Sequence, residues 1–79
     1  MRARERPALV NRLKVHRAER DWTQAELADR VGVTRKTINT VEGGIFVPST
    51  VLALKLAQAF GVPVEELFML PDGHGPARA

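Results

Sequence analysis

The 79-residue sequence contains no cysteine and few aromatic residues, namely one Trp and three Phe. The absence of cysteine excludes disulfides, thiolate nucleophiles and every zinc site that uses cysteine ligands. No apolar run approaches the roughly 18 residues that a membrane-spanning helix needs, and the N-terminus lacks the apolar segment of a signal peptide. We therefore expect a cytoplasmic protein with one small domain, because typical domains have about 100–200 residues.

The charged residues are distributed unevenly along the chain. Lys and Arg number 12 against 9 Asp and Glu, which gives a net charge of +3. Residues 1–40 carry a charge of +5, whereas residues 41–79 carry −2. A basic surface on a small domain is typical of proteins that bind a polyanion, which is nucleic acid or an acidic membrane.

Apolar periodicity divides the chain into three segments. Residues 1–8 include Arg2, Arg4 and Arg6, have no apolar period and are predicted to be a mobile basic arm. Residues 71–79 are rich in Pro and Gly and are predicted to be a flexible tail. The segment between them predicts a compact all-α bundle. Its five expected helices cover about residues 9–20, 24–31, 35–42, 50–60 and 63–70.

Cap residues support these helix limits. Thr23 and Glu26 form the capping box of the second expected helix, and Gly32 suits the left-handed conformation that ends it. Thr34 and Ser49 are suitable N-caps for the third and fourth helices. The tight connection at residues 32–34 makes the second and third helices a helix-turn-helix, with small Ala28 at their crossing. Their expected common core consists of Leu27, Val31, Val33, Ile38 and Val41.

The sequence from Trp22 to Phe60 resembles the lambda-repressor-like family of Cro and phage-repressor type. The similarity lies in the runs TQAELA at residues 23–28 and VGVTR at 31–35, and continues through Pro48-Ser49 into the fourth helix. It covers roughly residues 9–70 and is greatest with the short bacterial regulators of this family that stand alone. The resemblance implies a five-helix DNA-binding domain that regulates transcription, as a repressor and homodimer on two half-sites, without a cofactor.

In that family the third helix enters the major groove of double-stranded DNA. Carried over to this sequence, the resemblance implies four residues that read bases: Arg35, Lys36, Thr37 and Asn39. Gln24, at the start of the second helix, resembles the glutamine that holds a backbone phosphate. Further phosphate contacts are expected from Thr34, Thr40 and the backbone N–H groups of Gly43 and Gly44.

The resemblance also implies a partly buried ion pair between Arg17 and Glu42, which would orient the third helix. Trp22 is expected in the core. The loop after the third helix departs from the family, because apolar residues 45–47 replace polar ones. We interpret this triplet as core cover under the fourth helix, with part of a partner surface as the alternative.

The dimer surface is expected at the C-terminal segment Phe68-Met69-Leu70, which is apolar and could pair as a two-stranded ribbon. Two other functions stay open: an antitoxin that binds a toxin and autoregulates its operon, and a fold whose basic face meets an acidic protein. No catalytic motif, metal site or small-molecule site is evident. His16 and His74 are expected to be exposed side chains, so neither suggests an enzyme.

Overall fold

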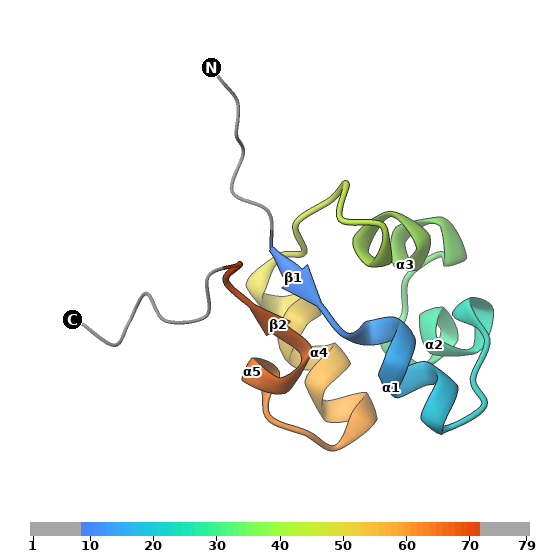
Figure 1. Cartoon of the computed structure of the whole chain (residues 1–79). Helices are drawn as coiled ribbons and strands as arrows, with labels where there is room; N and C mark the ends of the chain where they lie inside the picture. Colours follow the sequence, from blue (N-terminus) through green and yellow to red (C-terminus); the bar gives the residue numbers. More distant parts are fainter. Residues whose placement is uncertain (1–8, 72–79) are drawn as a thin grey trace.

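A computed structural model describes residues 9–71 of the chain. Five helices and two short strands make up this part of the chain (Figure 1). In chain order they are β1 (Val10–Asn11), α1 (Leu13–Glu19), α2 (Gln24–Val31), α3 (Arg35–Glu42), α4 (Thr50–Phe60), α5 (Val64–Leu67) and β2 (Phe68–Met69). The predicted arm at residues 1–8 and the tail beyond Pro71, with His74, lie outside the described residues.

The second, third and fourth helices match their predicted limits because local side chains fix both ends. In α2 the Thr23 hydroxyl accepts a hydrogen bond from the Glu26 N–H, and the Glu26 carboxylate accepts one from the Thr23 N–H. Gly32 then ends the helix at a φ of +75°. Thr34 and Ser49 cap α3 and α4 in the same way through their hydroxyls.

The two ends of the domain differ from the prediction. Residues 10 and 11 form β1, so the first helix begins at Leu13 rather than near Leu9. The last helix ends at Leu67, after which Phe68 and Met69 form β2. The strands are antiparallel, with Val10 opposite Met69 and Asn11 opposite Phe68. A minimal sheet therefore joins the two ends of an otherwise helical domain.

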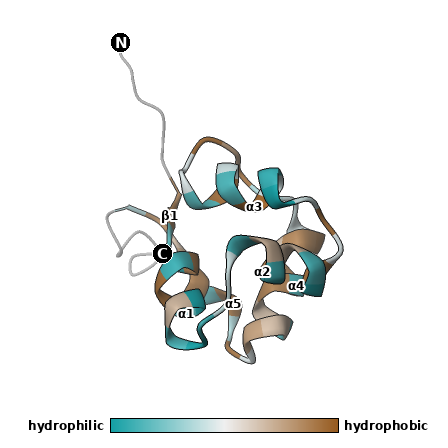
Figure 2. Cartoon of the chain, turned by 90° about the vertical axis from the view of Figure 1, so that its right-hand side faces the viewer, coloured by the Kyte–Doolittle hydropathy of each residue, from teal (hydrophilic) through white to brown (hydrophobic). Residues whose placement is uncertain are grey.

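Eleven apolar side chains from all five helices form one core. The members with no exposed surface are Leu13, Leu27, Ile38, Leu56 and Leu67. Trp22 is partly buried and stacks on Phe60 with ring centroids 5.4 Å apart, which confirms its expected place in the core. Figure 2 shows hydrophilic colours on the outer surface of α3 and a hydrophobic loop beside it. This distribution leaves α3 with one buried face and one polar face.

Two predictions about burial are wrong. His16 is buried with 9% exposure, because its ring packs beside that of Phe60 of α4, with the ring centroids 5.6 Å apart. Residues Ile45, Phe46 and Val47 do not cover the core and are instead exposed. The core under α4 is already filled by the helix residues Leu52, Leu56 and Phe60.

Candidate nucleic-acid interface

The first turn of α3 presents its charged residues to solvent. Thr34 ends the turn that begins at Gly32, and Arg35 and Lys36 follow it as exposed residues. On the opposite side of the helix, Ile38 and Val41 are buried, with 0% and 2% exposure. Because these two core side chains fix the rotation of α3, the orientation of its exposed residues is also fixed.

Gln24 of α2 lies against the middle and end of α3. Its Nε2 donates to Asn39 Oδ1 at 3.3 Å and to Glu42 Oε1 at 3.1 Å. Asn39 is exposed, so its amide is held in place while it still faces solvent. Gln24, which was predicted to contact a phosphate, and Asn39, which was predicted to contact a base, are thus hydrogen-bonded to each other.

Arg17 of α1 and Glu42 of α3 form a bidentate ion pair, in which two hydrogen bonds join the side chains. Arg17 Nε donates to Glu42 Oε2 at 2.6 Å, and Nη2 donates to Oε1 at 3.1 Å. Arg17 Nη1 also donates to the carbonyl of Trp22 at 2.8 Å. The two side chains are 14% and 7% exposed.

The hydrogen bonds to Glu42 raise the pKa of Arg17 above its ordinary value, although burial acts in the opposite direction. The guanidinium therefore stays charged at every pH at which proteins are studied. Because this charge neutralises that of Glu42, the pair adds no net negative charge to the surface beside it. The pair also connects α1 to the last residue of α3, so it holds the end of α3 against the domain.

The threonines of α3 are engaged within the helix. Thr34 accepts from the N–H of Thr37, and the hydroxyls of these two residues lie 3.0 Å apart. The half-buried Thr40 donates its hydroxyl proton to the carbonyl of Thr37 at 3.0 Å. Thr34 is exposed, whereas Thr37 and Thr40 are half-buried. A hydroxyl that donates inside the helix can still accept a bond but has no proton left for a phosphate.

The two glycines after α3 also use their N–H groups internally. Gly43 N–H donates to the carbonyl of Asn39 at 3.0 Å, and Gly44 N–H donates to that of Val41 at 3.1 Å. The expected phosphate contacts through these groups would require both bonds to open. Gly44 has a φ of +78°, which a residue with a side chain rarely adopts, so its role in this loop is conformational.

Several basic residues of the N-terminal half have structural partners. Arg20 Nη2 donates to the carbonyl of Phe60 at 2.8 Å and so caps the end of α4. The guanidinium of Arg30 lies 3.9 Å from the centroid of the Trp22 ring. The charge excess therefore overstates the number of cations that face outward beside α3. The exposed basic residues beside α3 are Lys14, Arg35 and Lys36.

Lys14 is a site residue that the sequence did not predict. It lines a groove of about 340 Å³ together with Arg17, Gln24, Asn39, Glu42 and Gly43. The groove thus brings residues of α1, α2 and α3 to one surface. The available signal was the spacing of Lys14 and Arg17, because residues three apart share one face of a helix.

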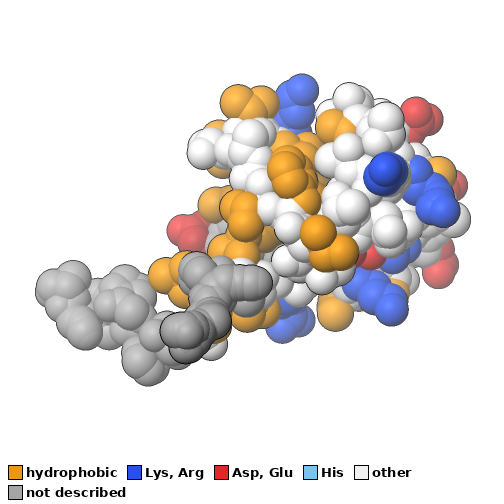
Figure 3. All heavy atoms as spheres, turned by 90° about the horizontal axis from the view of Figure 1, so that it is seen from above, with side chains coloured by type: hydrophobic (Ala, Val, Ile, Leu, Met, Phe, Trp, Pro, Cys, Tyr) orange, Lys and Arg blue, Asp and Glu red, His pale blue; other side chains and the backbone are white. Residues whose placement is uncertain are grey.

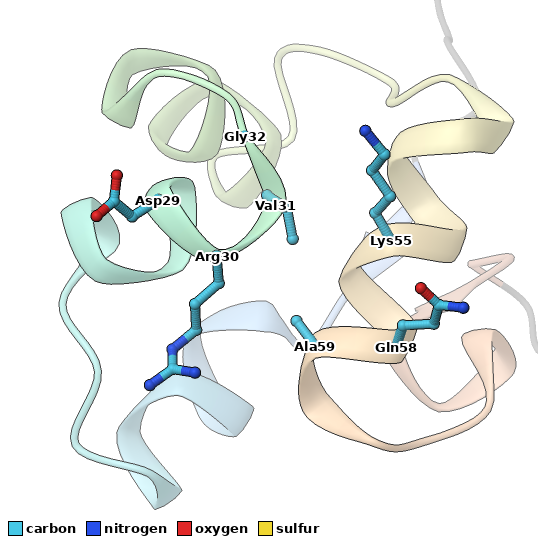
Figure 4. Close-up of a pocket in the computed structure, with 7 residues that line it drawn as sticks. All are labelled: Asp29, Arg30, Val31, Gly32, Lys55, Gln58 and Ala59. Atoms are coloured by element: carbon cyan, nitrogen blue, oxygen red, sulfur yellow. The ribbon is translucent and has the colours of Figure 1, made fainter.

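A second groove lies between α2 and α4 and has a volume of about 520 Å³. Its lining includes Asp29, Arg30, Lys55 and Gln58. Figure 4 shows that Asp29 and Arg30 point away from Lys55 and Gln58. The groove therefore lacks the convergent polar groups that orient a small ligand in a typical binding site.

Residues 9–71 contain no group of three or more His, Asp or Glu side chains that could hold a metal ion. Within the same residues, no helix has the length and apolar character needed to cross a membrane.

A model of the helix-turn-helix family matches residues 13–67, which include all five helices. The chain belongs to the lambda-repressor-like helix-turn-helix family. It is similar to an uncharacterized HTH-type transcriptional regulator of Methanocaldococcus jannaschii, at 45% identity over 81% of this chain and 97% of the relative. A similar regulator of Bacillus subtilis, also uncharacterized, is 42% identical over the same shares of the two chains.

A solved structure shows the same fold. The restriction-modification controller protein from Aeromonas hydrophila superposes with a TM-score of 0.67 and 36% identity, over 71% of this chain and 85% of that chain. Members of the lambda-repressor-like helix-turn-helix family are DNA-binding transcriptional regulators, so this chain is one as well, and it is not an enzyme. The names of these relatives do not favour the antitoxin alternative.

Proposed function

We propose that the chain reads the major groove of duplex DNA with α3, as a homodimer on two half-sites, and represses transcription there. The observation that carries this proposal is the exposed first turn of α3 on a helix whose rotation is fixed by its core residues and by the Arg17–Glu42 pair. B-DNA admits an α-helix only in its major groove, where the base edges carry a unique hydrogen-bonding pattern.

Four residues of α3 are proposed to read bases: Arg35, Lys36, Thr37 and Asn39. Arg35 is the strongest of these, because a guanidinium can donate to guanine O6 and N7 together, which is worth about 1–3 kcal/mol of discrimination. Asn39 is already oriented by Gln24, so less side-chain freedom is lost when it meets a base.

Phosphate contacts are proposed for the surface around the groove that Lys14 and Gln24 line. Gln24 is the first residue of α2, where unpaired N–H groups and the helix dipole favour an anion. Thr34 and Thr40 lie at the margins of α3, and Thr40 could contribute only after its hydrogen bond to the carbonyl of Thr37 opens. The N–H groups of Gly43 and Gly44 could contribute only after the loop rearranges. Lys14 adds a positive charge on the same side.

A homodimer follows from the small reading surface of one α3, which contacts only a few base pairs. Two copies on half-sites about one helical turn apart supply the affinity and specificity that a regulator needs. Occupation of such an operator within a promoter excludes the polymerase, so repression needs no further activity of the chain. As a DNA-binding protein it would work at the nucleoid in the cytoplasm.

Selection of bound duplexes from a random pool tests the proposal. We expect enrichment of a two-fold symmetric sequence, and binding that weakens steeply with salt because phosphate contacts release counterions. Lys14→Ala leaves the hydrogen bond between Gln24 and Asn39 intact and should weaken binding to all sequences equally, whereas a base-reading substitution should change the preferred sequence. Failure of the purified protein to enrich any sequence would refute the proposal.

A further inference from the structure

Five exposed hydrophobic side chains gather on the loop after α3 and on the adjoining face of α4. Their exposed fractions are 82% for Ile45, 48% for Phe46, 64% for Val47, 62% for Val51 and 52% for Leu54. Figure 3, which shows the molecule from above, has a strip of hydrophobic side chains across this face. We refer to these five residues as the apolar strip.

The apolar strip is held firmly relative to α3. The N–H groups of Ile45 and Phe46 both donate to the carbonyl of Thr40, at 3.0 and 3.2 Å. Ser49 then caps α4, and Val51 and Leu54 lie three residues apart on its outer face. A molecule bound to the strip would therefore have a fixed position relative to the recognition surface.

We propose that a second copy of this chain covers the apolar strip, so that two strips meet across a two-fold axis. The inference rests on the proposed function, since it assigns the surface of the proposed homodimer. The five residues of the strip carry no charge, so two strips can meet without like charges opposed within them, although the exposed Lys55 directly follows Leu54. An uncharged, self-complementary patch fits the requirement of a two-fold interface.

The exposed area of the apolar strip is large enough for contact with a second copy of the chain. Ordinary residue areas and the exposed fractions give the strip roughly 600 Å², which is the size of the largest apolar patches on monomers and is often functional. A standard interface buries about 800 Å² of each partner. The strip with its polar rim therefore provides enough surface for a small, reversible dimer.

The position of the strip also fits two half-sites. Because α3 has eight residues, it is about 12 Å long, and the strip begins three residues after its end. A two-fold axis that crosses the strip just beyond the end of α3, at right angles to that helix, would place the two first turns roughly 30 Å apart. Successive major grooves on one side of B-DNA are about 34 Å apart.

The C-terminal segment Phe68-Met69-Leu70 is the competing surface. Phe68 and Met69 are half-buried, and one edge of their strand already pairs with β1 in the same chain. Leu70 is exposed. A substitution at Leu70 therefore distinguishes the two surfaces.

Sedimentation equilibrium over low to high micromolar concentrations tests the proposal on the full chain. Val51→Glu and Leu54→Glu each place a charge in the strip, and both should weaken dimerisation about tenfold or more because the charge becomes buried without a partner. Val51 is the second residue of α4, where an acidic side chain favours the helix, so the first variant should fold. Val15→Glu, an exposed valine on α1, is the matched control and should dimerise like the wild type.

The outcomes separate this inference from the proposed function. A wild type that stays monomeric, both free and on selected duplexes, would overturn the inference, as would dimers that resist both strip substitutions. Dissociation by Leu70→Glu alone would place the interface at the C-terminal segment. Binding of Val51→Glu to a single half-site with unchanged affinity would show that DNA recognition survives loss of the dimer.

Discussion

Glu42→Gln weakens the Arg17–Glu42 pair at nearly constant side-chain shape, because it removes the negative charge and leaves a single oxygen to accept a hydrogen bond from Arg17. Charge-assisted hydrogen bonds are worth about 1.5–3 kcal/mol, against roughly 0.5–1.5 kcal/mol for neutral ones. Two such bonds join these side chains, and the pair is largely buried. We therefore expect the free energy of unfolding to fall by about 2 kcal/mol.

For a domain of this size that loss corresponds to a fall in Tm of roughly 8–16 °C. Thermal unfolding followed by circular dichroism measures it directly. Glu19→Gln is the matched control, because Glu19 lies 3.7 Å from Arg20 but its side chain is 62% exposed, and exposed pairs contribute little.

A fall in Tm of less than about 2 °C for Glu42→Gln would refute this reasoning, since it corresponds to under roughly 0.5 kcal/mol. The effect should not vary with pH in the neutral range. A raised pKa of Arg17 means that the stability it contributes is fully present below the ordinary arginine pKa and is lost only as the pH rises through the raised value.

Three further substitutions have defined outcomes. Thr23→Ala removes the hydroxyl of the α2 capping box and should cost about 1 kcal/mol in urea unfolding, and an unchanged midpoint would contradict the role of the cap. Gly32→Ala should cost about 1–2 kcal/mol through its positive φ alone, because no atom lies within 4 Å of the added Cβ, so a neutral result would contradict the left-handed conformation. Lys14→Ala should reduce the magnitude of the slope of log affinity against log salt by about 0.9 for each copy of the chain, or about 1.8 for the proposed dimer, and an unchanged slope would show that Lys14 contacts no phosphate.

The limits of α2, α3 and α4 could be predicted because residues next to each helix determine them. Thr23, Thr34 and Ser49 act through hydroxyls that reach only three residues along the chain, and Gly32 needs no distant partner. The same holds for the helix-turn-helix, in which only three residues separate the end of the first helix from the start of the second. Local chemistry is therefore sufficient for the part of the fold that positions the candidate site.

Features that depend on distant contacts were predicted poorly. Strand β1 exists only because Val10 and Asn11 find Met69 and Phe68 at the other end of the domain. His16 is buried because Phe60 of α4 packs beside it, and its neighbours in sequence do not show this. Residues 45–47 of the strip were expected to cover the core under α4, but hydrogen bonds to Thr40 hold their loop outward.

The sequence predicted one part of the candidate site, the exposed positions on α3, but not the groove beside them. The exposed positions of Arg35, Lys36 and Asn39 follow from helical periodicity around Ile38 and Val41. The groove that adds Lys14 depends on how α1 packs across α2 and α3, which only the tertiary structure determines.

Recognition of bases by α3 is tested most directly when wild-type and Arg35→Ala proteins are compared in parallel selections from one random duplex pool. We expect the Arg35→Ala protein to lose its preference at one base pair of each half-site, by roughly 5- to 150-fold, since a bidentate contact is worth about 1–3 kcal/mol. The other positions and the salt dependence should change little. The same preferred sequence from both proteins, at every position and with equal strength, would contradict base reading by Arg35 at the first turn of α3.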